Sequence, residues 1–413
     1  MSYFEKAQFQ PTIWGQDAFG KLRVSEPLTL FDSKQNVTNG GGVWDQLTLS
    51  GTSTFQPSGA QTAMSVVAFS GAYVIRQSLE RMNYSPGKSQ NILLTATSMD
   101  PQTNVIKRIG YFNSDGGGTY ASPYDSNRDG VWFEASGSTF SVKIGNNGVE
   151  ETATQSQWNI DTLNGSGPSG KTVTDWSKNQ IYGIDFEWLG VGSVRYYTVI
   201  DGQYCYIHQF NHANSGTGVY MSTPNHSVRY EIRSIGGSGT LNHICSTVQS
   251  EGGSEPRTIN REINNGSAGV TGPNANISWA ALAFRKNPAV VNAPGIGLNI
   301  DSLEITSTAV NAQGGWQMII DPTIAGAALT WTNVPNASGI QYAIGAATNT
   351  TSGGTAIAGG FWNTASKGNT IDKETKSNIG VGISGNAQVL VVAPYSTQNT
   401  VTTNVSANLK LTY

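Results

Sequence analysis

The chain has few charged residues and only two cysteines, whereas nucleic-acid-binding proteins depend on basic residues and disulfide-rich proteins on cysteines. Charged residues make up 12% of its 413 residues, about half the usual share of a soluble protein. The net charge is −3 and lysine and arginine form no run, so we expect no nucleic-acid partner. The two cysteines, Cys205 and Cys245, predict two buried thiols, with a single disulfide as the alternative.

Long apolar runs and helical periodicity are also missing. The longest apolar stretches, such as "WAALAF" and "VLVVA", are far too short to span a bilayer. The start, "MSYFEKAQFQ", has no basic segment followed by an apolar one, so we expect neither a secretory signal nor membrane insertion. No stretch shows a sustained 3.6-residue apolar period, and no heptads or fixed-period repeats occur.

Alternating apolar and polar residues are the pattern that is present. Short alternating runs such as "ILLTATSM" and "VRYEIRSIG" recur at intervals of roughly 8–15 residues, separated by Gly, Asn, Asp and Ser. The chain holds 49 glycines and recurring tryptophans and tyrosines. This pattern predicts an all-β protein built of stacked sheets rather than a disordered chain.

Composition divides the chain into four regions. We predict that residues 1–42 form an extended arm, which ends in the flexible joint "NVTNGGG". Residues 43–252 predict a first β-sandwich, and residues 253–274, rich in Gly and Asn, predict a linker. Residues 275–413 predict a second β-sandwich, which the alternating C-terminal run "TTNVSANLKLTY" closes.

The arm is too short to bury its own apolar side chains. We therefore expect these residues to dock on the body of the protein or on a neighbouring subunit: Trp14, Phe19, Leu22, Val24, Leu28, Leu30 and Phe31.

The segment "VRYYTVIDGQYCYIHQF", residues 194–210, predicts a hairpin. Asp201 and Gly202 suit a type I′ turn, because both central residues of that turn need a positive φ. The turn aligns the two strands so that one sheet face carries the following side chains: Arg195, Tyr197, Val199, Tyr204, Tyr206 and His208.

The arm and the middle of the chain carry a family resemblance. "AFGKLRVSEPLTLFDSKQ", residues 18–35, resembles the opening signature of a family of tailed-bacteriophage structural proteins, with Lys21 where the family usually has arginine. "IDFEWLGVGSVRYYTVIDG", "YMSTPNHSVRYEI" and "ICSTVQSEGG" extend the resemblance over roughly residues 14–255. The middle part is similar to concanavalin-like jelly rolls, the fold of many lectins.

The resemblance implies a virion component without assigning its role. We expect a decoration or fibre-like protein on the head exterior, the neck or the tail, assembled in the host cytoplasm and acting through many weak contacts with other virion proteins. Self-association is expected because virion positions are symmetric, and a trimer is our guess. The alternative is a receptor-recognition protein that binds a glycan of the host surface. No cofactor is expected.

The hairpin face offers the residues for such a glycan site. Aromatic side chains on a concave sheet stack on sugar rings, and Arg195 and His208 could bond hydroxyls of a sugar lying on Tyr197, Tyr204 and Tyr206. The alternative interpretation, which we favour, is that the tyrosines pack against one another across the strands without a ligand.

Two further patterns could carry chemistry. In "DSNRDGVWFEAS", residues Asp125, Asn127 and Asp129 match the start of an EF-hand loop, but Ser136 stands where the bidentate Glu should be. A loop calcium site is weighed there against an ordinary polar turn.

Asp185 and Glu187 share one face of a strand by period two and could act as the acid and base of a glycanase. We expect no enzyme, because charges are sparse and both carboxylates could equally face solvent. His208, His212 and His226 lack the spacing of a zinc site.

Overall fold

The protein divides into two compact units, residues 1–255 and 256–413. The computed structural model describes residues 15–18, 20–114, 127–252, 258–290, 295–307, 309–363, 375–376 (backbone only) and 379–412. These residues form β-strands and two short 3-10 turns, Pro57–Gly59 and Gln155–Gln157, with no α-helix among them. The predicted all-β class is confirmed.

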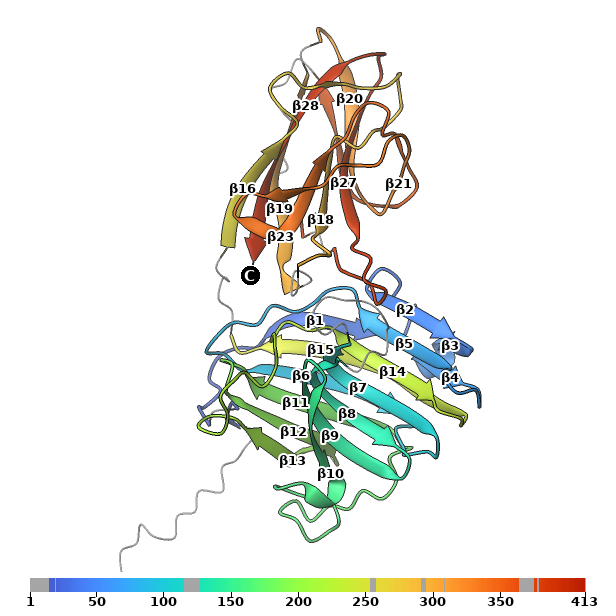
Figure 1. Ribbon diagram of the computed structural model, residues 1–413, viewed down its shortest axis with the longest axis vertical. Coiled ribbons are helices and arrows are strands. Elements are labelled where there is room, and N and C mark those ends of the chain that lie inside the picture. Colours follow the sequence, from blue (N-terminus) through green and yellow to red (C-terminus); the bar gives the residue numbers. More distant parts are fainter. Residues whose placement is uncertain are drawn as a thin grey trace, which may run out of the picture. The chain divides into compact units, whose positions relative to one another are not determined.

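The first unit is a sandwich of two antiparallel sheets, which Figure 1 shows stacked on each other. The eight-stranded sheet runs in the order β13 (Gln203–Asn211), β12 (Ser193–Ile200), β11 (Gln180–Glu187), β6 (Gln90–Thr97), β15 (Gly239–Ser250), β4 (Gln61–Val66), β3 (Gly51–Gln56), with β1 (Leu28–Lys34) paired to β15. The seven-stranded sheet runs in the order β10 (Val149–Thr154), β9 (Thr139–Asn146), β8 (Asp129–Ser136), β7 (Val105–Asn113), β14 (Val228–Ser234), β5 (Tyr73–Ser78), β2 (Trp44–Leu49).

Period-two alternation builds the core between these sheets. In β6, Ile92, Leu94 and Ala96 are buried while Asn91 and Leu93 on the other face are half-buried. The facing sheet contributes aromatic and branched side chains, among them Tyr111, Val131, Phe133 and Val142. The result is the jelly-roll-like sandwich that the sequence predicts.

The hairpin forms as predicted, except at one end. Asp201 and Gly202 both have positive φ, 51° and 74°, and Val199 pairs with Tyr204 and Tyr197 with Tyr206. Beyond that point a bulge adds one residue to β13, so His208 pairs with Tyr196 rather than with Arg195.

The second unit is also a β-sandwich. Its sheets have five strands, β16 (Thr258–Asn264), β28 (Thr402–Thr412), β19 (Gly297–Ser307), β26 (Thr375–Lys376) and β17 (Val270–Thr271), and six strands, β22 (Thr332–Val334), β23 (Ala337–Ile344), β18 (Leu282–Lys286), β27 (Val389–Ser396), β20 (Gln313–Ile320) and β25 (Thr355–Asn363). A two-stranded ribbon joins β21 (Thr323–Ile324) to β24 (Thr351–Ser352). Leu409 and Ile300 of the first sheet pack with Phe284 and Leu390 of the second.

Two predicted boundaries need correction. The linker expected at 253–274 contains β16, which pairs with β28 over residues 258–264, and β17. The arm expected at 1–42 contains β1, a strand of the eight-stranded sheet. The Gly- and Asn-rich composition of residues 253–274 is typical of linkers, but it also fits β16, because β16 is an edge strand whose outer face is polar.

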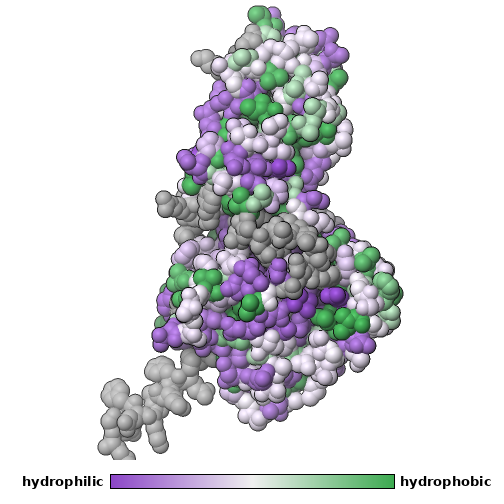
Figure 2. Space-filling view, in the orientation of Figure 1, coloured by the Kyte–Doolittle hydropathy of each residue, from purple (hydrophilic) through white to green (hydrophobic). Residues whose placement is uncertain are grey.

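The surface agrees with the composition. Figure 2 shows small, separate apolar groups within a mainly polar or neutral visible face. Both cysteines are free thiols, but only Cys205 is buried, whereas Cys245 is half-buried. None of the described residues belongs to a helix that could cross a membrane.

Candidate functional site

The N-terminal segment lies across the outer face of the eight-stranded sheet, the face turned away from the core. We call residues 15–18 and 20–25 the strap. Its chain doubles back on itself, because the Arg23 amide donates to the Gly15 carbonyl at 2.8 Å and the Asp17 amide to the Lys21 carbonyl at 2.7 Å. Its backbone also accepts two bonds from the sheet. Ser193 Oγ donates to the Ala18 carbonyl at 2.5 Å and Arg195 Nη2 to the Gln16 carbonyl at 2.9 Å.

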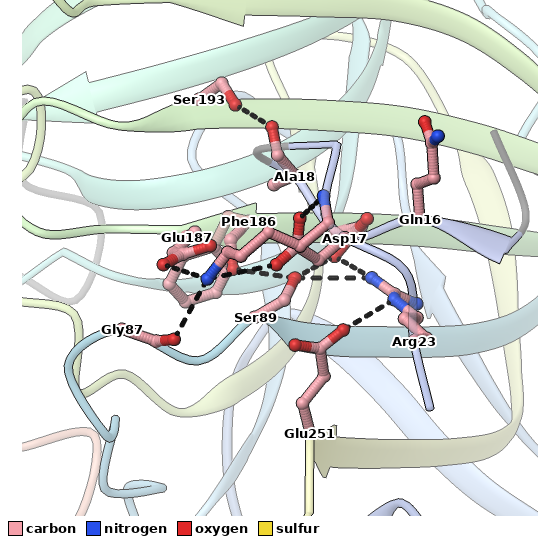
Figure 3. Close-up of polar contacts among 12 residues, drawn as sticks. Gln16, Asp17, Ala18, Arg23, Gly87, Ser89, Phe186, Glu187, Ser193 and Glu251 are labelled. Carbon is pink, nitrogen blue, oxygen red and sulfur yellow. Dashed lines mark hydrogen bonds and ion pairs between the residues drawn. The ribbon is translucent and has the colours of Figure 1, made fainter. Parts of the chain in front are cut away.

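Asp185 is the central acceptor beneath the strap. Figure 3 shows the strap residue Arg23 next to two of its other partners, Ser89 and Glu251. Arg23 of the strap and Arg195 of β12 donate to the two oxygens of Asp185 at 2.5 and 2.7 Å. Ser89 Oγ donates to it at 2.5 Å. The carboxylate is fully buried, so the two guanidinium groups supply the counter-charge that water would otherwise provide.

Glu187 lies two residues further along the same strand and the same face. Its Oε1 is 3.4 Å from Lys21 Nζ, which is also 3.3 Å from Asp17 Oδ2. Burial raises the pKa of Glu187, Lys21 opposes the shift, and the neighbouring Asp17 and Glu251 add to it.

Glu251 closes the cluster from the end of β15. Its Oε1 is 2.9 Å from Arg23 Nε. Burial raises the pKa of this carboxyl too, and Arg23 opposes that shift. Ion pairs and backbone bonds therefore hold the described residues of the strap to the sheet.

The hairpin face that carries Tyr197, Tyr204 and Tyr206 lies beside the strap, and most of its side chains are buried. Tyr197 and Tyr206 pack at 5.0 Å and Arg195 lies over the Tyr206 ring at 5.2 Å. Both tyrosines and Arg195 are buried. Tyr204 alone among the predicted sugar-binding residues is exposed, at 44%.

His208 does not share this face. After the bulge its ring packs on Phe210 at 4.4 Å, and its Nδ1 accepts a bond from the Asn159 amide at 3.2 Å. Burial lowers the pKa of His208 to about 4, so the ring is neutral at pH 7. The predicted grouping of His208 with Tyr206 is corrected, because a bulge shifts register by one residue and reverses the face.

Asp129, one of the predicted calcium ligands, already accepts hydrogen bonds within the protein. Ser222 donates to its carboxylate from the amide at 2.9 Å and the hydroxyl at 2.7 Å, and His226 Nε2 lies 3.2 Å away. Burial acts to raise the pKa of Asp129, but His226 and Ser222 outweigh it and lower that pKa. Asn127 is half-buried and Asp125 lies outside the described residues. In the described part of the chain, no three His, Cys, Asp or Glu residues gather as metal ligands would.

The predicted docking residues of the arm divide into two groups. Phe31 and Leu30 join the core of their own sandwich. Leu22, Val24 and Leu28 are exposed, at 70%, 90% and 43%. Trp14 and Phe19 lie outside the described residues. The sequence prediction missed the arm's charged residues, Lys21 and Arg23, although both lie inside the signature that carries the family resemblance.

Comparisons with known proteins give likenesses of fold. No protein-family model and no curated protein matches the chain. Solved structures similar to it include a Bacillus licheniformis beta-glucanase (12% identity, 53% of this chain and 96% of that chain, TM-score 0.32). Others are the Emp46p carbohydrate recognition domain in its potassium-bound form (8%, 53% and 95%, 0.34) and a legume lectin-like domain from Entamoeba histolytica (8%, 55% and 99%, 0.33). At this level of similarity they say nothing about ligand or reaction.

Proposed function

We propose that the protein is a non-catalytic structural component of a tailed-phage particle, whose strap presents apolar side chains to neighbouring subunits. The observation that carries this proposal is that the strap has two kinds of side chain with different environments. Its charged side chains hold the sheet, while Leu22 and Val24 on the same segment remain exposed. Exposed apolar side chains that lie next to one another mark protein contact surfaces more than isolated ones do, and Leu22 and Val24 are two residues apart on the strap.

The chemistry under the strap supports a role without catalysis. A glycanase needs one carboxyl to donate a proton and a second carboxylate within reach of the sugar. Asp185 instead accepts bonds from two arginines and a serine, and the strap covers both it and Glu187. Neither carboxyl is open to a polysaccharide chain while the strap is in place.

The family resemblance supports the virion assignment. The signature "AFGKLRVSEP" includes Ala18, Lys21 and Arg23, and "IDFEWLGVGSVRYY" includes Asp185, Glu187, Ser193 and Arg195. These two separate stretches supply the two sides of the strap contact. The resemblance and the strap therefore describe the same feature of the molecule.

Particle incorporation tests the proposal. The double substitution Leu22→Ser and Val24→Ser removes two apolar contacts of about 1.5–3 kcal/mol each if they are buried by a neighbour. We expect its incorporation, measured by quantitative mass spectrometry of purified particles, to fall at least about tenfold. Val149→Ser with Val310→Ser is the matched control, because both residues are as exposed, at 76% and 84%, and neither belongs to the strap. Equal incorporation of both double variants would contradict the proposal.

Glycan binding is the second candidate, and exposed Tyr204 favours it. Tyr204 stands on the outer face next to Tyr197, at 5.1 Å between ring centroids, and its ring is free to stack on a sugar. Tyr204→Ala should then abolish binding on a glycan array, whereas Tyr73→Ala should not. An array on which the unaltered protein binds nothing would remove this candidate.

A further inference from the structure

The first unit has five strands that pair with a neighbour on one side only, within the part of the chain that the structure describes. They are β13 and β3 at the ends of the eight-stranded sheet, β10 and β2 at the ends of the seven-stranded sheet, and β1 beside β15. An open strand edge presents N–H and C=O groups that can pair with another chain, so proteins usually cover such edges or place charged residues on them. The protection of each edge therefore indicates which one is available to a partner.

Four of these edges are protected. A loop segment covers β13, because the amides of Ile160 and Asp161 both donate to the Ile207 carbonyl at 3.1 Å. The other three strands carry charged residues: Glu150 and Glu151 in β10, Asp32 and Lys34 in β1, and Asp45 in β2. Covering segments and charges are the usual means of keeping two sheet edges apart.

The edge of β3 has neither kind of protection. The strand reads "GTSTFQ" and contains no charged residue and no proline. It pairs with β4 on one side, and among the described residues no other backbone hydrogen bond reaches it. In an antiparallel pair every second residue directs its N–H and C=O away from the neighbouring strand. The other edge of β3, which Figure 1 shows at the margin of the first unit, is therefore open.

The absence of charge favours a second copy of β3 as the partner. When two identical strands pair about a two-fold axis, each side chain lies opposite a side chain of the same strand. A charge near the axis would then meet its own copy, which is destabilising, whereas a different partner could supply the opposite charge. On its outer face β3 carries the exposed residues Thr52, Thr54 and Gln56. An axis through Thr54 places Thr52 opposite Gln56, so every pair on this face is uncharged and polar.

We propose that β3 is an interface between two copies of the chain, which join their eight-stranded sheets edge to edge into one continuous antiparallel sheet. Backbone hydrogen bonds across the new strand pair would hold the two copies together. This contact goes beyond the proposed function, because it is a second surface and depends neither on the strap nor on the virion role. Two-fold pairing gives a dimer, whereas a trimer, our guess from the sequence, would need a contact of another kind.

Sedimentation equilibrium of the full-length protein over a series of concentrations tests this interface. We expect a monomer–dimer equilibrium in the unaltered protein. Thr52→Lys with Thr54→Lys should raise the Kd of the dimer at least about tenfold, because the lysines of the two copies would lie close together across the axis. Ser138→Lys with Thr139→Lys is the matched control. It adds the same charge at two exposed residues where β8 turns into β9, and it should leave the dimer unchanged.

Hydrogen exchange in the unaltered protein locates the contact without any substitution. Every second amide of β3 should become protected as the protein concentration rises, whereas the amides of Gly137 and Ser138 should not. Far-ultraviolet circular dichroism establishes that each double variant is folded. A monomer at every concentration or a trimer would overturn the proposal, and so would a dimer that persists with both lysines in β3. Dissociation by Leu22→Ser with Val24→Ser, with no effect of the β3 lysines, would also overturn it and would assign self-association to the strap.

Discussion

At the scale of single residues, Asp185 and Arg23 decide how the outer face is used. Sequence alone places Asp185 and Glu187 on one face of a strand by period two, and the structure agrees. The partner could not be predicted in this way. Arg23 is 162 positions away, in a segment without regular secondary structure, and no periodic rule relates the two residues.

Asp185→Asn tests the strength of this contact. The substitution keeps the shape of the side chain but leaves Arg195 buried without its counter-charge. We expect the first unit to lose about 3 kcal/mol of unfolding free energy, measured by urea unfolding. The Arg23 amide should also lose its protection against hydrogen exchange. Asp301→Asn, at an exposed position of the second unit, should change stability by less than about 0.5 kcal/mol, and a similar loss in both variants would contradict this account.

At the scale of strands and turns, the hairpin shows what a sequence pattern does and does not determine. Asp201-Gly202 sets the turn and the first pairs correctly, because turn chemistry acts over a few residues. Beyond the bulge, His208 packs on Phe210 of the same strand and accepts a bond from the Asn159 amide. Asn159 lies in a loop 49 positions away, and no local sequence signal announces that contact.

Gly183 is a second feature that the sequence does not reveal. The Tyr197 ring lies directly over it and continues to Asn91 on β6, where its hydroxyl donates a bond of 2.6 Å. A Cβ on residue 183 would lie 2.0 Å from the Tyr197 ring, so the glycine is needed for the close approach of the ring rather than for a turn.

Gly183→Ala should therefore displace Tyr197 and destabilise the first unit by about 1–3 kcal/mol. Thermal unfolding would measure the loss. Gly216→Ala is the matched control, since a Cβ there meets no atom within 4 Å and should cost little. An unchanged midpoint in Gly183→Ala would show that the ring can move aside freely.

At the scale of the whole molecule, alternation predicts two sandwiches but not their boundary. The second unit begins at residue 256 rather than at 275, because β16 covers one side of β28 while β19 covers the other. Polar, glycine-rich composition is shared by linkers and by edge strands, so only the pairing distinguishes them.

Fragments of the second unit test this boundary. Residues 256–413 should unfold in one cooperative transition, because both sheets are complete. Residues 275–413 lack β16 and its buried Ile263, which leaves the long strand β28 unpaired along one edge. We expect this shorter fragment to aggregate or to lose several kcal/mol of stability, as judged by denaturant unfolding and light scattering. Equal stability of the two fragments would restore 253–274 as a linker.

An image of the particle at a resolution that traces residues 15–34 tests the central claim most directly. We predict that the strap lies on the eight-stranded sheet, with Arg23 at Asp185, and that Leu22 and Val24 are covered by a neighbouring protein subunit. A strap whose apolar residues face only solvent in every copy, or particles that lack the protein altogether, would contradict a structural role.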